Sequence, residues 1–309
     1  MIKYTFTIII FLFSCLSSMS FAISPLISYE KLTNDFKNLN YTILDIRDTS
    51  SFKKGHIEGS VSAPYKIFRG NTDNPGKMLE TEILENTFEK LGLSMEKPII
   101  IISQGNTPTD FGAAARVYWT LKSSGFEDLA ILNGGIKIWK INGSELTQKT
   151  KKIIPTDLNI NFSYEWTATT NEIKNSPKNT TTLLIDARPS DFYNGNKKHK
   201  AAKVPGTIPS SENFDFNNFF VNNSTFLTEI GIKDGTRLLD QIGFNSKKNI
   251  ISFCNTGHWA ATNWFVMSEL IGKENVKLYP GSMVEYTNLN LPIENSPGLI
   301  KNLLESLSN

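Results

Sequence analysis

The chain has 309 residues, a formal net charge of +2 and a hydrophobic fraction of 39%. This length fits two domains of about 150 residues each, and the hydrophobic fraction allows each of them a core. The nearly balanced charge and the lack of a basic stripe give nucleic-acid binding no support.

The first 22 residues have the pattern of an export signal. Lys3 is followed by an apolar run at residues 4–16, and Ser20 and Ala22 are small residues typical of a cleavage site. The run is too short to predict a membrane-spanning helix. We therefore expect cleavage near Ala22, a periplasmic or secreted protein and no membrane span after cleavage. The alternative is a lipoprotein that is anchored through Cys15.

Two parts of the chain repeat one pattern roughly 140 residues apart. In each, an apolar strand ends in Asp-x-Arg: Asp45 and Arg47 in the first copy, Asp186 and Arg188 in the second. A spacing this long indicates domain duplication and excludes a short solenoid repeat.

The downstream halves of the copies also match. Apolar strands at residues 99–103 and 250–253 each enter a polar loop, an amphipathic helix and a second short strand that ends in a glycine turn. Continuously apolar strands that alternate with helices predict an α/β fold in which each domain has a parallel sheet flanked by helices. We expect the signal at residues 1–22, an N-terminal domain at 23–148, a linker at 149–165 and a C-terminal domain at 166–309.

Cys254 stands where the second of these strands enters its loop. Backbone N–H groups converge in such a loop, and the following helix adds positive potential, so a thiolate is stabilised there. Gly257 would give the loop the backbone freedom to curl around one sulfur atom. If Cys15 is removed with the signal, no intramolecular disulfide can form. The residues alone leave two interpretations open, a reactive nucleophile and a buried structural cysteine.

The order of these motifs resembles the rhodanese family in its tandem two-domain form. The resemblance depends on the stretch LDIRD…GHIEGS…PY at residues 44–65, the strand–Cys254–loop–helix, and the LNGG…W sequence that ends at Trp139. It implies an inactive first domain and a catalytic second domain. By our sequence comparison, Gln104 takes the place in the first domain that Cys254 takes in the second.

The resemblance implies a sulfurtransferase that works by double displacement. Cys254 would take the outer sulfur of a small anionic donor such as thiosulfate, and the resulting persulfide would pass it to cyanide or a thiol acceptor. Arg188 is implied to bind the anionic group of the donor, and Asp186 to hold that arginine or the loop. The loop residues implied to bind the substrate are Asn255, Thr256, Gly257, His258, Trp259 and Ala260.

The loop departs from the family's usual sequences. It has no arginine near its end, which argues against a related phosphatase, and it lacks the basic residues of many thiosulfate enzymes. Phe192 and Tyr193 occupy the region of the second arginine in mercaptopyruvate enzymes, which favours thiosulfate. His258 could be charged, donate a hydrogen bond to the donor, or face solvent. The alternatives are a 3-mercaptopyruvate sulfurtransferase and a non-catalytic persulfide carrier.

No cofactor is expected, and the histidines and cysteine of the chain have no metal-ligand spacing. A monomer is expected.

Overall fold

The computed structural model describes residues 23–35, 41–176, 179–221 and 224–298. The predicted export signal, including Cys15 and Ala22, lies outside these residues. No described helix has the length and apolar character needed to cross a membrane.

The first domain is built on a five-stranded parallel sheet with the order β1-β5-β4-β2-β3. Its central strand β4 consists of four isoleucines, all buried, as is typical of a parallel strand covered on both faces. The strands are β1 (Leu26–Ile27), β2 (Thr42–Asp45), β3 (Val61–Ser62), β4 (Ile99–Ile102) and β5 (Leu129–Leu132). The helices are α1 (Tyr29–Asp35), α2 (Thr49–Lys54), the 3-10 turn η1 (Tyr65–Phe68), α3 (Thr81–Lys90), α4 (Pro108–Ser123) and α5 (Gly135–Ile141).

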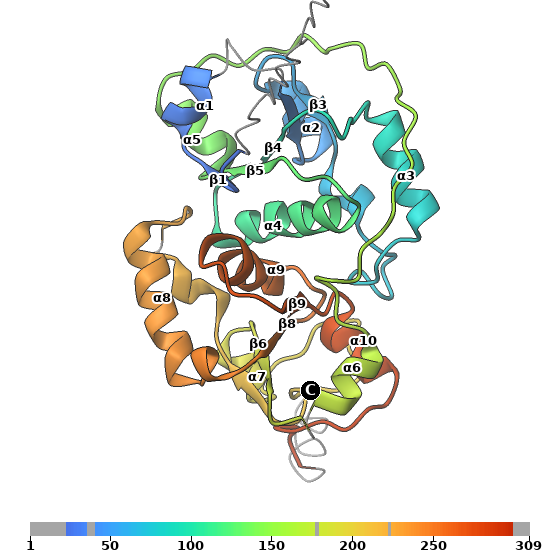
Figure 1. Cartoon of the computed structure of the whole chain (residues 1–309), viewed down its shortest axis with the longest axis vertical. Coiled ribbons are helices and arrows are strands. Elements are labelled where there is room, and N and C mark those ends of the chain that lie inside the picture. Colours follow the sequence, from blue (N-terminus) through green and yellow to red (C-terminus); the bar gives the residue numbers. More distant parts are fainter. Residues whose placement is uncertain (1–22, 36–40, 177–178, 222–223, 299–309) are drawn as a thin grey trace, which may run out of the picture.

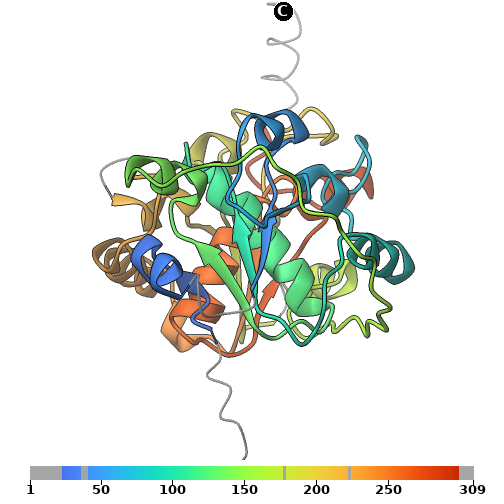
Figure 2. The same ribbon diagram turned by 90° about the horizontal axis from the view of Figure 1, so that it is seen from above.

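The second domain has a four-stranded parallel sheet with the order β7-β6-β8-β9. The strands are β6 (Thr182–Asp186), β7 (Ser211–Asn213), β8 (Asn249–Phe253) and β9 (Val276–Leu278). The helices are α6 (Thr170–Asn175), α7 (Ser190–Tyr193), η3 (Phe216–Phe219), α8 (Glu229–Gln241), η5 (Phe244–Ser246), α9 (Trp259–Phe265), the π-helix η6 (Val266–Leu270) and α10 (Ser282–Asn288). The predicted pair of parallel α/β domains is therefore confirmed (Figures 1 and 2).

The two domains meet through α4 and α9, which lie side by side in the middle of the molecule (Figure 1). One hydrophobic core runs through this junction and includes Trp119 of α4 and Trp264 and Phe265 of α9. Buried polar contacts add to it, because Glu269 accepts a hydrogen bond from Tyr118 at 3.0 Å and forms an ion pair with Lys122 at 2.9 Å. Because the two domains share one buried hydrophobic core, they are held in a fixed position relative to each other.

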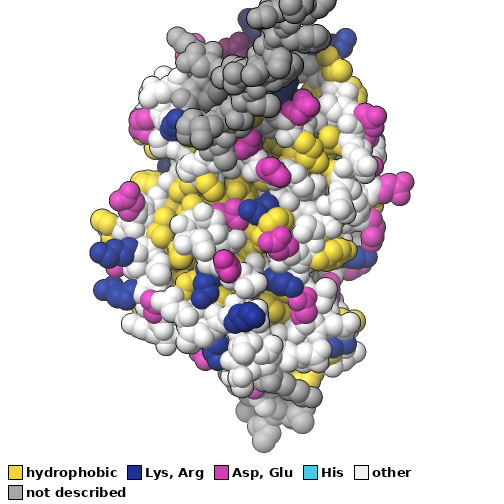
Figure 3. Space-filling model, in the orientation of Figure 1, with side chains coloured by type: hydrophobic (Ala, Val, Ile, Leu, Met, Phe, Trp, Pro, Cys, Tyr) yellow, Lys and Arg dark blue, Asp and Glu magenta, His cyan; other side chains and the backbone are white. Residues whose placement is uncertain are grey.

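The segment that joins the domains runs over the outside of the first domain, past α3 (Figure 1). The N–H of Thr156 donates to the carbonyl of Glu89, and the N–H of Ile160 to the Glu85 carboxylate. The chain then enters the second domain where Thr167 pairs with Leu278. On the face shown in Figure 3, side chains of both charge signs are interspersed and form no continuous basic stripe.

Candidate active site

Cys254 follows the last residue of β8, and five residues later α9 begins at Trp259. The cysteine is 1% exposed and carries a free thiol. In the described part of the chain, five backbone N–H groups of this segment donate to no protein acceptor: those of Asn255, Thr256, His258, Trp259 and Ala260. Unpaired N–H groups ahead of a helix carry positive potential, so the loop can hold an anionic sulfur.

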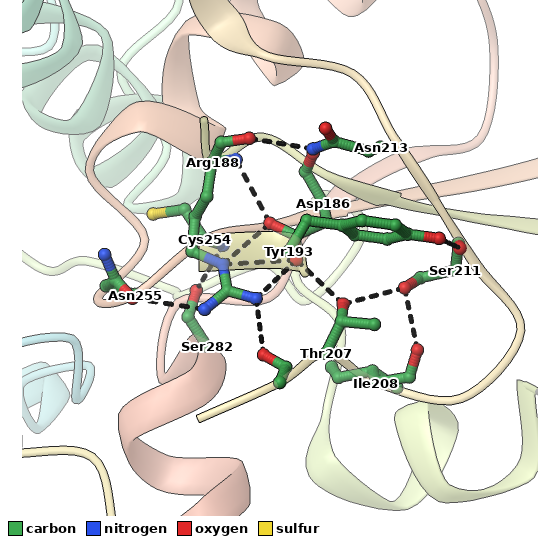
Figure 4. A network of polar contacts seen from close by, with 11 residues as sticks. Asp186, Arg188, Tyr193, Thr207, Ile208, Ser211, Asn213, Cys254, Asn255 and Ser282 are labelled. Carbon is green, nitrogen blue, oxygen red and sulfur yellow. Dashed lines mark hydrogen bonds and ion pairs between the residues drawn. The ribbon is translucent and has the colours of Figure 1, made fainter. Parts of the chain in front are cut away.

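Ser282 holds this loop in shape from the start of α10. Its Oγ accepts the N–H of Cys254 at 3.1 Å and that of Gly257 at 3.0 Å, and donates to the carbonyl of Tyr279 at 2.8 Å (Figure 4). The N–H of Gly257 is therefore bound inside the protein, so it does not take part in the substrate binding that the resemblance implied for this residue. Sequence reasoning missed Ser282, whose one unusual feature, a φ of 52°, is visible in the structure alone.

Gly257 has the backbone freedom that the loop was predicted to need. Its φ is 65°, in the left-handed region that favours glycine. A Cβ at this position would collide with the guanidinium of Arg116 and lie 2.6 Å from the carbonyl oxygen of Pro280. Both the turn and the close approach of Arg116 and Pro280 therefore require glycine here.

Asp186 holds Arg188, which is one of the two roles that the family resemblance implied for it. The arginine donates from Nε to Oδ1 at 2.8 Å and from Nη2 to Oδ2 at 2.6 Å, and Nη2 also reaches the carbonyl of Gly206 at 2.8 Å. Nη1 lies 3.4 Å from Oδ1 of Asn255, so the guanidinium is surrounded by protein acceptors. Figure 4 shows this network, with the sulfur of Cys254 pointing to the side opposite Asp186.

Arg188 is 1% exposed, and this arrangement gives no support to its predicted contact with the donor. The same pair recurs in the first domain, where Arg47 binds Asp45 at 2.6 Å and the carbonyl of Gly55 at 2.8 Å. The pair therefore forms without a cysteine nearby, as expected of a structural contact. The structure thus places Arg188 behind the loop, where it supports Asn255.

His258 binds the first domain through both ring nitrogens. Nε2 donates to the carbonyl of Thr109 at 2.8 Å, which leaves Nδ1 to accept the hydroxyl of Tyr65 at 2.9 Å. Burial, reinforced by the charge of Arg69, lowers the pKa of His258 to about 3. The histidine is therefore neutral near pH 7, and the expectations of a charged, donor-binding or solvated side chain are all corrected.

Trp259 packs against aromatic side chains beside the loop. Its ring is stacked on Phe216 with centroids 5.2 Å apart, and Phe192 meets it edge-on at 5.9 Å. Its Nε1 lies 3.2 Å from Oγ1 of Thr109 in the first domain. The next residue, Ala260, is fully buried.

Two arginines of the first domain reach the same loop, and no sequence motif indicated them. Arg69 donates from Nη2 to the carbonyl of Thr256 at 2.9 Å. Arg116 donates from Nη1 to the carbonyl of Gly257 at 3.3 Å and from Nη2 to that of Gly76 at 3.1 Å. The site is therefore built from both domains.

The first domain carries a serine in place of the cysteine. Strand pairing aligns Asp45 with Ile102 and, in the second domain, Asp186 with Phe253, so Ser103 and Cys254 are the equivalent next residues. The carbonyls of both accept equivalent N–H groups, from Ile136 at 2.8 Å and Met283 at 3.0 Å. The predicted equivalence of Gln104 and Cys254 was wrong by one residue, because sequence alone does not fix the register of two strands.

The loop of the first domain is also occupied by the protein itself. The N–H groups of Asn106 and Thr107 donate to the carboxylate of Asp110 at 2.8 and 3.0 Å. This carboxylate caps the start of α4. The first domain therefore lacks the thiol, and two N–H groups of its loop are already bound.

In the described residues, no three side chains of His, Cys, Asp or Glu gather as metal ligands would.

Comparison with known proteins places this architecture in a family. The family described as "Rhodanese-like domain" matches the chain twice, at residues 28–142 and 169–289. A protein of Mycolicibacterium smegmatis named "Putative thiosulfate sulfurtransferase" is 28% identical over 263 residues, which cover 80% of this chain and 88% of that protein. A protein of Saccharopolyspora erythraea with the same name is 28% identical over 266 residues, with the same two shares covered.

Solved structures show the same fold. SseA from Escherichia coli, described as a 3-mercaptopyruvate sulfotransferase, superimposes with a TM-score of 0.72 at 22% identity over 84% of this chain and 99% of its own. An anaerobic ergothioneine biosynthesis enzyme from Chlorobium limicola superimposes with a TM-score of 0.74 at 18% identity, over 87% of this chain and 70% of its own.

Proposed function

The chain belongs to the rhodanese-like domain family, and we propose that it is a sulfurtransferase that takes sulfane sulfur from thiosulfate through a persulfide on Cys254. The observation that carries this proposal is the position of Cys254 at the end of β8, in a loop with five unpaired backbone N–H groups. The names of its relatives, at 28% identity, favour thiosulfate as the donor.

The proposed reaction has two displacements at sulfur. The Cys254 thiolate attacks the outer sulfur of thiosulfate, the bond between the two donor sulfurs breaks, and sulfite leaves with the electron pair. The enzyme then carries a persulfide anion. A thiophile such as cyanide attacks the outer sulfur of the persulfide, thiocyanate leaves, and the Cys254 thiolate is restored. Electrons balance over the cycle without a redox cofactor.

The loop supports both displacements in the same way. Each begins or ends with negative charge on the sulfur of Cys254, and N–H groups that are already held in one loop stabilise such charge without needing to reorganise. Ser282 keeps them in place by holding the loop on both sides of Asn255 and Thr256. Burial of Cys254 to 1% exposure shields the persulfide from water and favours a small donor.

The test is steady-state release of thiocyanate from thiosulfate and cyanide by the full chain, with 3-mercaptopyruvate as a second donor. Repeated turnover with thiosulfate supports the proposal. Turnover with 3-mercaptopyruvate but not with thiosulfate would show that 3-mercaptopyruvate is the donor instead. A single turnover per chain would indicate a persulfide carrier. Cys254→Ser should abolish release, whereas Ser103→Ala, at the equivalent position of the first domain, should leave it unchanged.

We further propose that the protein is exported and cleaved near Ala22. The apolar run at residues 4–16 supports this proposal. The test is to determine the N-terminal residue of the protein recovered from the periplasm or the medium. A chain that starts at Ile23 supports cleavage, and a lipid on Cys15 supports the lipoprotein alternative. A chain that starts at Met1 contradicts both.

A further inference from the structure

We infer that the domain without the cysteine completes the active site, with Arg69 and Arg116 as positioning residues that supply its positive charge. The inference rests on the proposed function only for its consequence, which is binding of anionic sulfur at Cys254. The structural argument depends on the contacts between the domains.

Arg116 belongs to a stripe of α4 that faces the Cys254 loop. Thr109, Gly112 and Arg116 are three and four residues apart, so they lie on one face of the helix. Thr109 binds His258, and a Cβ at Gly112 would lie 3.1 Å from Cδ2 of the same ring, so the helix approaches the loop closely here. Arg116 then reaches the carbonyl of Gly257.

Each arginine holds the oxygen of one loop peptide. The carbonyl of Gly257 shares its peptide with the N–H of His258, which is one of the unpaired groups of the loop. The carbonyl of Thr256 shares its peptide with the N–H of Gly257, which Ser282 accepts. A cation on a carbonyl polarises the whole peptide, so Arg116 strengthens an N–H available to the sulfur and Arg69 strengthens an anchor of the loop.

The positive charge of the two arginines is not neutralised inside the protein. In the described part of the chain no carboxylate forms an ion pair with either. Nη1 of Arg69 and Nε of Arg116 are buried and have no hydrogen-bond partner. Arg116 is 1% exposed, so its charge is costly to bury unless an anion is close by.

The electrostatics point to that anion. Burial, and after it the charge of Arg69, lowers the pKa of Arg116 to about 9, whereas negative charge on Tyr65 and, after it, on Cys254 acts in the opposite direction. Burial raises the pKa of Tyr65, so this phenol carries no negative charge near pH 7. His258 is neutral and Arg188 is paired with Asp186, so neither group neutralises the two arginines. An anionic sulfur at Cys254 is thus the partner that the arginines lack.

The test replaces each arginine by methionine, which keeps much of the apolar stem, and by lysine, which keeps the charge. The control is Arg237→Met, since Arg237 is exposed on α8 and pairs with Asp234. The thiolate absorbance of Cys254 is followed from pH 5 to 10 as the difference between each protein and its Cys254→Ser version. The rate of persulfide formation with thiosulfate at pH 7 is measured next.

Loss of either arginine should move the appearance of the Cys254 thiolate to higher pH by about one unit, which is a tenfold loss of thiolate at a given pH. Persulfide formation should slow about tenfold, and lysine should restore part of both. Arg69 is only partly buried, so Arg69→Met is the variant expected to fold, as thermal unfolding will show. If Arg116→Met does not fold, Arg69→Met decides alone.

A folded Arg69→Met protein whose thiolate appears at the same pH as in the unchanged protein would overturn the inference. This titration needs no donor, so it is separate from the proposed function. An unchanged protein that forms no persulfide with any donor defeats the proposed function, while the titration still decides the role of the arginines.

Discussion

The hydroxyl of Tyr65, in the first domain, donates to Nδ1 of His258, in the second, at 2.9 Å. Together with the bond from Nε2 to Thr109, it fixes one neutral tautomer of a histidine only four residues from Cys254. The loop histidine thus joins the domains, and the positive charge beside the loop comes from arginines of the first domain.

The neutral state of His258 predicts a dependence of stability on pH. Its pKa is about 3 in the folded protein and near 6.5 when unfolded, so the unfolded state binds more protons between these values. The free energy of unfolding should therefore fall with decreasing pH, by at most about 2 kcal/mol between pH 7 and pH 5 from this residue, since the ring keeps partial exposure.

Urea unfolding of the unchanged protein and of His258→Gln at both pH values measures this contribution. The variant should be less stable at pH 7 but lose less stability on acidification. Equal losses in both proteins would show that His258 is not held neutral.

Removal of the Ser282 hydroxyl should loosen the Cys254 loop. Ser282→Gly suits the φ of 52° but leaves the N–H groups of Cys254 and Gly257 without their acceptor, at a cost of about 2–4 kcal/mol in the free energy of unfolding. Persulfide formation should also slow. Ser246→Gly is the control, because the hydroxyl of Ser246 is exposed and donates to one local carbonyl. Similar stability of the two variants in urea would contradict the role of Ser282.

Gly257→Ala separates backbone strain from crowding at the domain junction. Gly257 and Gly272 have similar φ values, 65° and 77°, but a Cβ at Gly272 meets no atom within 4 Å. Gly272→Ala should cost about 1–2 kcal/mol from strain alone. Gly257→Ala should cost clearly more and impair persulfide formation, because the Cβ displaces Arg116 and the loop. Equal melting temperatures for the two variants would show that a Cβ at Gly257 is accommodated without cost, and would contradict the crowding.

Features of the fold and the site that depend on one short segment could be predicted from the sequence, whereas contacts between distant segments could not. The parallel sheets, Cys254 at the end of β8 and the Asp186–Arg188 pair follow from patterns within one segment, such as the apolar strand and Asp-x-Arg. The register that makes Ser103 the counterpart of Cys254 depends on hydrogen bonds between strands, which similar polar loops do not reveal.

The contributions of the first domain could not be predicted. Arg69 lies 185 positions and Arg116 138 positions before Cys254 in the chain. Their approach to the Cys254 loop depends on how α4 packs on α9. The spacing of Thr109, Gly112 and Arg116 indicates a helix face but not what that face contacts. For the same reason the sequence left open whether His258 is charged, binds the donor or faces solvent.

Matched variants of the two Asp–Arg pairs test whether Arg188 touches the donor. Arg47→Lys and Arg188→Lys each lose the two-pronged contact with a buried aspartate and should lower the free energy of unfolding by about 1.5–3 kcal/mol. Arg188→Lys alone should lower kcat, through Asn255, with a KM for thiosulfate within about twofold of the unchanged protein. A KM raised about tenfold or more would instead restore the predicted contact with the donor.

The most direct test of the central claim is the intact mass of the full chain after incubation with thiosulfate, beside Cys254→Ser. The account predicts a gain of about 32 Da, one sulfur atom, that is lost on addition of cyanide and absent from the variant. No gain with thiosulfate or 3-mercaptopyruvate, or an equal gain in the Cys254→Ser protein, would contradict it and leave Cys254 as a buried structural thiol.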